Sequence, residues 1–177
     1  MGPGRCGLRW SSVALLALLA APAAADPLGL GRPATPADIA GWNIDVRPDG
    51  RGLPPGSGSV AQGQTVFAAS CAACHGANGT TATPAPALVG GQGTLASAKP
   101  VRTVGSYWPY ATTVFDYVRR AMPFNAPGSL SDAQVYAVTA FLLNRNGIVP
   151  ADAVMDAKTL PAVRMPNRHG FRSLWRP

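Results

Sequence analysis

The pattern C-x-x-C-H at Cys71, Cys74 and His75 constrains this chain more than any other feature of the sequence. In such a pattern each thiol adds across one vinyl group of a porphyrin, and the two intervening residues let both sulfurs reach one edge of the ring. The histidine follows directly, so its imidazole reaches the iron as the proximal ligand. The sequence therefore predicts one covalently bound haem c.

Two other readings of the cysteine pair fit less well. A redox C-x-x-C of the thioredoxin type opens a helix after a strand, within a βαβ pattern, whereas this pair closes an expected helix. A structural zinc site needs about four ligands. Beyond the motif, the only spare candidate for such a ligand is His169.

Residues 1–25 have the composition of a secretory signal peptide. Two arginines precede an apolar run at 13–20, and an A-x-A cleavage site follows at 23–25. The apolar run is too short to span a bilayer, which needs about 20 apolar residues. We therefore expect a mature chain that starts at Asp26, has no membrane span and works in the periplasm.

The charge balance argues against nucleic acid as a partner. The sequence holds 15 Lys and Arg against 8 Asp and Glu, a net charge of +7. Loss of Arg5 and Arg9 with the signal peptide lowers it to 7 − 2 = +5, and two haem propionates would lower it further. The basic residues are scattered and form no run of the kind that a nucleic-acid groove needs. The remaining positive charge is consistent with an acidic docking partner, and equally with charge that only keeps the protein soluble.

Three main helices are expected, and capping boxes begin two of them. In a capping box a serine caps the amide three residues on, and a glutamine there reaches back. This pattern begins the helices expected over 59–71 and 131–147. A third helix should cover about 110–120 and stop because Pro123 disfavours helical geometry at Met122.

The segments outside 59–147 are expected to form an extended N-terminal arm at 26–58 and a C-terminal tail at 148–177. The arm is rich in proline and glycine, with one helical turn near 35–40 and a strand-like stretch at 42–46. Both segments hold apolar residues that would be costly to leave in water, so we expect them to dock on a partner protein. These residues are Trp42, Ile44, Val46, Leu160, Val163, Phe171 and Trp175.

The long loop expected at 76–106 makes sense if it wraps a cofactor that supplies part of the core. A ligating imidazole normally donates its other N–H to a carbonyl, and the carbonyl of Pro86 is the candidate acceptor for His75. Buried propionates would need polar partners of their own. Three nearby side chains qualify, although core packing explains the aromatic ones equally well: Arg102, Tyr107 and Trp108.

The sixth iron ligand is expected to be Met122. It lies between two helices, and Pro123 keeps its backbone extended, so the thioether can point inward. Met155 and Met165 compete but lie beyond the last helix, and methionine is more often core filler than ligand. Ligation by His169 and an open sixth position are the remaining alternatives.

These motifs together resemble the class I cytochrome c family over about 59–147. The resemblance implies an all-α class I cytochrome c fold around one covalently bound haem, in which the first and last helices cross. It also implies single-electron transfer. The helix crossing in that family uses a glycine, two aromatic residues and an aliphatic one, and the matching positions here are Gly63, Phe67, Val138 and Phe141.

A narrower resemblance covers nearly the whole mature chain. The segments at 41–60, 103–124 and 146–171 are similar to the cytochrome subunits of periplasmic sulfur-oxidation dehydrogenases, which include the SoxD-type subunit of sulfane dehydrogenase and the cytochrome subunit of sulfite dehydrogenase. The resemblance implies an electron-accepting subunit whose partner is a molybdenum-cofactor sulfite or sulfane dehydrogenase. A downstream cytochrome c or an oxidase would then take the electrons.

Two other functions compete with this assignment. A free electron shuttle between respiratory complexes would not need the long arm and tail. A haem enzyme or gas sensor would need an open sixth position, and Met122 would then be filler. The sequence contains no acid–base dyad, nucleophile constellation or phosphate loop that we can identify, so we expect the chain alone not to be an enzyme.

Overall fold

The computed structural model describes residues 30–82 and 84–175, and the signal peptide expected at 1–25 lies outside them. The chain divides into two units, Met1–Asp38 and Ile39–Pro177, and the features below belong to the second unit except for the start of the first helix. In chain order the elements are α2 (Pro36–Ala40), β1 (Ser57–Ser59), α3 (Val60–Ser70), α4 (Ala72–His75), α5 (Ala111–Ala121), α6 (Asp132–Arg145), β2 (Val154–Asp156) and α7 (Thr159–Ala162).

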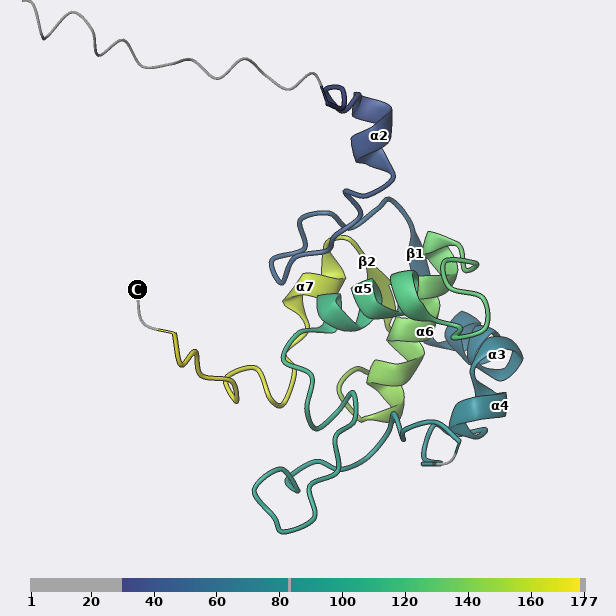
Figure 1. Ribbon diagram of the computed structural model, residues 1–177. Coiled ribbons are helices and arrows are strands. Elements are labelled where there is room, and N and C mark those ends of the chain that lie inside the picture. Colours follow the sequence, from purple (N-terminus) through teal and green to yellow (C-terminus); the bar gives the residue numbers. More distant parts are fainter. Residues whose placement is uncertain (1–29, 83, 176–177) are drawn as a thin grey trace, which may run out of the picture. The chain divides into compact units, whose positions relative to one another are not determined.

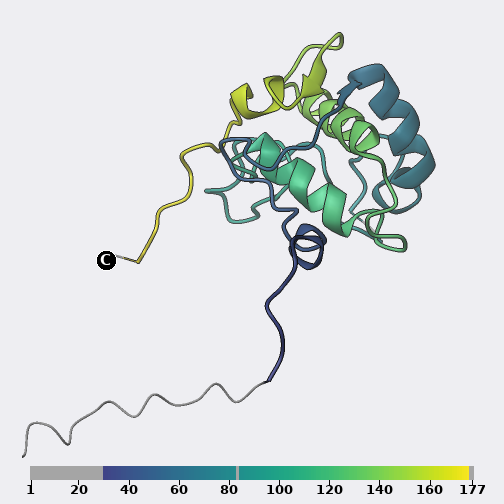
Figure 2. The same cartoon turned by 90° about the horizontal axis from the view of Figure 1, so that it is seen from above.

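Helix α6 is the centre of the larger unit. It packs against α3 and against α5, and Figures 1 and 2 show it between these two helices. Its central residues from Val135 to Leu143 are all buried, as expected for a helix that contacts neighbours on more than one face. The expected fold class is confirmed, with one small two-stranded sheet added to the helices. None of the described helices is long and apolar enough to cross a membrane.

The crossing of α3 and α6 depends on Gly63. A Cβ atom there would overlap the backbone carbonyl of Ala137 and lie 2.7 Å from the Cβ of Phe141. Next to this contact the rings of Phe67 and Phe141 pack with their centroids 5.1 Å apart. Three of the four positions proposed for the crossing thus meet there, and Val138 is buried on the same helix.

Gly63→Ala should therefore destabilise the protein. We expect the free energy of unfolding to fall by about 3 kcal/mol, the upper end of the usual cost of overpacking, because the obstacle is helix backbone. The better helix propensity of alanine offsets only about 1 kcal/mol of the strain. Denaturant unfolding of the haem-loaded protein measures the change. Gly41→Ala is the control, since nothing lies within 4 Å of a Cβ there; equal stability of both variants would contradict the close crossing.

Both capping boxes are present. At α3 the amide of Gln62 donates to Ser59 Oγ at 3.2 Å, and the amide of Ser59 donates to Gln62 Oε1 at 2.9 Å. Ser131 and Gln134 make the same pair of bonds at α6. Helix α5 starts one residue later than expected, because Tyr110 is its cap. The long loop between α4 and α5 and the helical turn at α2 are also confirmed.

The first half of the C-terminal tail belongs to the protein's own core. Strand β1 pairs antiparallel with β2, with Ser57 opposite Asp156 and Ser59 opposite Val154. Beyond β2, Leu160 is 0% exposed, and Val163 is half-buried against the same core. The expectation that Leu160 and Val163 need a partner to cover them is therefore wrong, since this chain covers them itself.

The N-terminal arm is attached to α5 by side-chain hydrogen bonds and not by a strand. The amide of Val46 donates to Asp116 Oδ1 at 3.1 Å, and the guanidinium of Arg119 donates to the carbonyl of Ile44 at 3.4 Å. Val46 is 7% exposed, whereas Trp42 is 88% exposed. The strand expected at 42–46 is wrong, because its apolar residues do not share one buried face.

Candidate functional site

The two cysteines of the motif lie on one helical turn. Helix α3 ends at Cys71, and α4 follows at once. The amides of Cys74 and His75 both donate to the carbonyl of Cys71, at 3.1 and 3.0 Å. Residues three apart on a helix share a face, so the Cys71 and Cys74 thiols can reach one edge of a porphyrin. Cys71 is half-buried and Cys74 is exposed, and neither forms a disulfide.

The Cys71 thiol is not arranged for disulfide exchange. Burial, with a smaller contribution from the neighbouring Cys74, raises its pKa to about 11. Reactive cysteines of the thioredoxin type work as thiolates and have a lowered pKa. Cys71 therefore lacks the lowered thiol pKa that is typical of a redox dithiol.

The imidazole of His75 is oriented by the long loop. Its Nδ1 lies 2.8 Å from the carbonyl oxygen of Pro86. A carbonyl can only accept, so Nδ1 carries the proton and Nε2 keeps a free lone pair. This is the arrangement in which a histidine serves as a metal ligand, because the second hydrogen bond fixes both tautomer and ring orientation. The geometry matches the hydrogen bond expected between these two residues.

Asn146, which the sequence analysis did not single out, holds that loop in place. Its buried amide nitrogen donates to the carbonyls of Leu88 and Leu142, at 3.1 and 2.8 Å. Its side-chain oxygen accepts from the amide of Gly90 at 3.1 Å. The residues that follow Pro86 are thus tied to the end of α6. In the sequence, an asparagine near a helix end predicts only that the helix ends there. Its hydrogen bonds to the distant loop could not be predicted from the sequence.

Met122 lies where the sequence placed it, at the end of α5. Its backbone is extended, with φ −125° and ψ 147°, and its amide donates to the carbonyl of Val118. The side chain is half-buried and packs against the hydrophobic core. Among the competitors, Met155 and Met165 are buried core residues, and His169 is exposed. Met122 remains the predicted sixth ligand.

The donor set on this chain fits a haem. It comprises two thiols on one turn, an imidazole with Nε2 available, and a half-buried thioether at Met122. Cys71 and Cys74 would hold the porphyrin, and His75 and Met122 would ligate the iron. Figure 1 shows α4, which carries the motif, beside the end of α3 and at the start of the long loop.

The three side chains considered for the propionates lie near one another, and part of their surroundings is the tail. The guanidinium of Arg102 lies 5.5 Å from the ring centre of Tyr107, and the edge of that ring meets Phe171 at 5.1 Å. Trp108 is half-buried and packs edge-on against Tyr117. Arg102 and Tyr107 are at the surface, and a role of these residues toward propionates remains a prediction.

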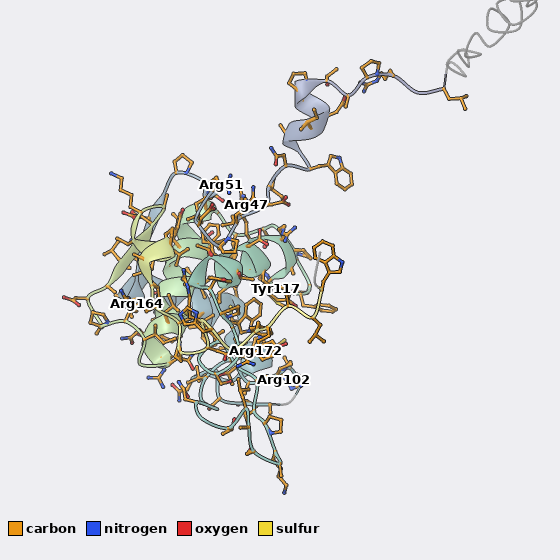
Figure 3. The ribbon with its side chains drawn as sticks, turned by 90° about the vertical axis from the view of Figure 1, so that its left-hand side faces the viewer. Arg47, Arg51, Arg102, Tyr117, Arg164 and Arg172 are labelled. Carbon is orange, nitrogen blue, oxygen red and sulfur yellow. The ribbon has the colours of Figure 1, made fainter. Side chains whose placement is uncertain are left out.

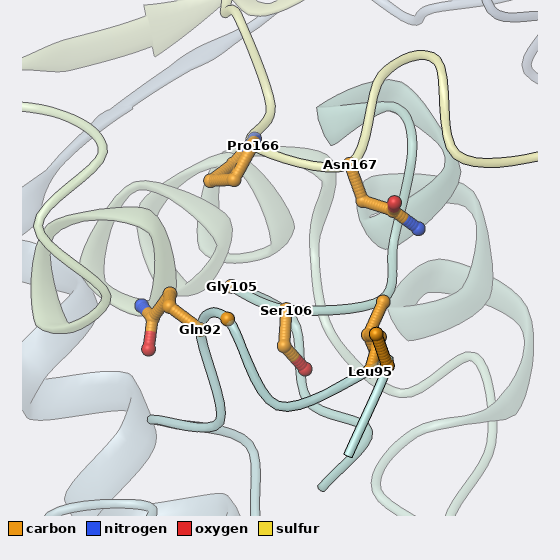
Figure 4. Close-up of a pocket in the computed structure, with 8 residues that line it drawn as sticks. Gln92, Leu95, Gly105, Ser106, Pro166 and Asn167 are labelled. Atoms are coloured by element: carbon orange, nitrogen blue, oxygen red, sulfur yellow. The ribbon is translucent and has the colours of Figure 1, made fainter. Parts of the chain in front are cut away.

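A separate hollow of about 270 Å³ lies where the long loop meets the tail (Figure 4). Its lining contains none of the four predicted haem-binding residues. The loop supplies Gln92, Leu95 and Ser106. Pro166 and Asn167 come from the tail, and the Asn167 amide donates to the carbonyl of Tyr107 at 2.7 Å. The hollow therefore lies at the contact between the long loop and the C-terminal tail.

Comparison with known proteins shows the family of this chain. A family model described as cytochrome c matches residues 60–146. The crystal structure of the sulfane dehydrogenase SoxCD from Paracoccus pantotrophus contains a chain 49% identical to this one. The match covers 82% of this chain and 72% of that chain, with a TM-score of 0.78. A search of curated proteins finds no match. The chain therefore belongs to the cytochrome c family, as a class I cytochrome c of the SoxD type with one covalently attached haem.

Proposed function

We propose that this chain is the electron-accepting subunit of a periplasmic, molybdenum-dependent sulfite or sulfane dehydrogenase, and that it is not itself catalytic. It would receive electrons one at a time from the molybdenum subunit and pass them to a downstream cytochrome c or an oxidase. The predicted signal peptide at 1–25 supports export to the periplasm.

The observation that carries the proposal is the extent of the similarity to SoxCD. The cytochrome c family model ends at residue 146, whereas the similarity to the sulfane dehydrogenase spans 82% of this chain at 49% identity. The shared sequence thus includes residues outside the general cytochrome c core. Outside 60–146 this chain holds β1, β2 and α7 and the segment that attaches the arm to α5, and a match over 82% of the chain is longer than the cytochrome c domain alone.

The residues of the site suit electron transfer. A haem bound here supplies an iron that alternates between two oxidation states and so carries one electron. Pro86 orients the imidazole of His75. With Met122 as the second protein ligand, the iron would have no vacant position for a substrate. Methionine ligation raises the reduction potential, which suits an acceptor. Asn146 ties the loop that follows Pro86 to the end of α6.

Reduction by the dehydrogenase tests the proposal. The mature, haem-loaded protein should be reduced within seconds by the molybdenum subunit of a SoxCD-type enzyme supplied with its sulfur substrate, followed by the rise of the reduced haem absorption. The two subunits should also co-purify. Omission of the substrate, or of the molybdenum subunit, is the control.

Reduction with sulfite alone, or with a sulfane substrate alone, would distinguish the two dehydrogenase classes. If neither substrate reduces the haem although ascorbate does, the sulfur-oxidation assignment is wrong. The protein would then be a shuttle between other respiratory complexes.

A further inference from the structure

Two segments without a single acidic residue meet on one side of the protein. Residues 50–115 contain no Asp or Glu, and neither do residues 157–177. Within the described part, the tail lies against the first of these segments through an Asn167 hydrogen bond to the Tyr107 carbonyl. The Phe171 and Tyr107 rings meet at 5.1 Å. Because the charged side chains of both segments are basic, the surface formed where they meet carries positive charge only.

This contact builds what we call the arginine–aromatic surface, which consists of Arg102, Tyr107, Arg168, Phe171 and Arg172. Arg102 lies over the ring of Tyr107, and Arg168 lies over the ring of Tyr110 at 4.7 Å. Figure 3 labels Arg102 and Arg172 in the same region of its view. Tyr107 is 36% exposed and Phe171 is 53% exposed, so the aromatic rings are open to solvent between the cations.

The cations of this surface have no acidic partner in the described residues. The ion pairs found there involve other arginines, namely Arg32, Arg51, Arg119 and Arg120. A surface built only for solubility mixes both signs. Arg102 and Arg168 lie over aromatic rings and Arg172 is exposed, and the two segments that carry them contain no carboxylate.

The residue types are those of a protein interface. Interfaces are enriched in Tyr, Trp, Phe and Arg and depleted in Lys, Glu and Asp. Of the basic residues in this chain only Lys99 and Lys158 are lysines, and neither belongs to the surface as defined. Arginine suits such a role because its planar group binds carboxylates with two hydrogen bonds and stacks on aromatic faces.

We propose that the arginine–aromatic surface binds an acidic surface of the molybdenum dehydrogenase subunit. The proposal rests on the proposed function and names the surface on this chain and the chemistry of its partner. The arginines would pair with carboxylates of the dehydrogenase, and Phe171 would be buried between them. Since the loop that carries Arg102 also carries Pro86, docking there connects the partner to the segment that orients His75.

Charge reversal tests the surface. In the full-length, haem-loaded protein, the double variant Arg168→Glu/Arg172→Glu should slow second-order reduction by the dehydrogenase at least about tenfold at low salt, because steering between opposite charges changes association rates by 10 to 1,000 times, roughly. The difference from wild type should shrink above about 0.1 M salt, where the screening length falls to about 10 Å.

Arg47→Glu is the matched control. Arg47 is exposed and has the same charge, and Figure 3 labels it next to Arg51 and apart from Arg102 and Arg172. It should stay within about twofold of wild type, as expected for an exposed charge outside the interface. Reduction by ascorbate and the haem spectrum should be unchanged in both variants, which shows that the fold and the haem are intact.

Two results would overturn the proposal in distinguishable ways. If wild type is reduced by the dehydrogenase and the double variant is reduced equally fast at low salt, the surface is not the docking site, while the proposed function stands. If wild type itself is not reduced by the dehydrogenase, both proposals fail. An equal loss in Arg47→Glu would show a general effect of net charge and would also reject this surface.

Discussion

Cys71→Ala should lose most of its covalently attached haem. The two thiols lie on one turn and would together hold one edge of the porphyrin, so without Cys71 only one thioether bond could form. The intact mass of the wild-type protein should equal residues 26–177 plus one haem. For the variant, mass spectrometry should find the haem-free chain as the main species, and denaturing gels should show little haem-linked peroxidase activity.

Ser70→Ala is the control for this experiment, since Ser70 is the last residue of α3 and precedes the motif without belonging to it. It should keep its haem. A wild-type mass with two haems, or one that includes residues 1–25, would contradict the single site or the predicted cleavage. Full attachment in Cys71→Ala would mean that Cys74 alone is sufficient.

Met122→Ala should abolish the weak near-infrared band that a methionine sulfur gives on ferric haem. The side chain is half-buried at the end of α5, and in class I cytochromes this band requires the sulfur on the iron. The reduction potential should fall at the same time, because a methionine ligand raises it. Absorption spectroscopy of the oxidised protein and redox titration measure the two effects.

The matched controls are Met155→Leu and Met165→Leu. Both methionines are buried in the core, where truncation to alanine would cost about 2–5 kcal/mol, whereas leucine conserves volume and costs less than about 1.5 kcal/mol. Both variants should keep the band. If the band disappears in Met165→Leu and persists in Met122→Ala, the ligand is on the tail and the present choice is wrong.

Local patterns predicted the helices well. The capping boxes at Ser59 and Ser131 set both helix starts through bonds between residues three apart, and such bonds are visible in the sequence. The end of α5 before Pro123 was predicted for a similar reason, because proline acts on its immediate neighbour. The spacing of Gly63 and Phe67 placed them on one side of a helix, since positions four apart share a face, and the family resemblance implied that this side crosses the last helix.

Features that depend on distant contacts were missed. Strands β1 and β2 have three residues each and contain no clear alternation, so their pairing could not be read from either segment. Leu160 looked like a docking residue because the core that buries it is formed by other parts of the chain. Val46 is buried through a bond to Asp116, 70 positions away.

In the candidate site, too, the contacts between residues close in sequence were predicted and the distant ones were missed. The bond from His75 to Pro86 was expected, since the motif and the loop lie 11 positions apart. Asn146 was not, because it acts on Gly90 across 56 positions. The contact of Tyr107 with Phe171 joins two segments that have no shared pattern, so the surface they build was visible only in the structure.

The order in which the domain folds follows from the pairing of β1 with β2. Ser57 and Asp156 are 156 − 57 = 99 positions apart, and closing so long a loop costs chain entropy that short-range contacts avoid. Non-local contacts of this kind slow folding. The turn that carries the haem-binding motif needs only residues close in sequence, so we expect it to form while the two ends of the domain are still apart. Pairing of β1 with β2 should then close the domain as a late step.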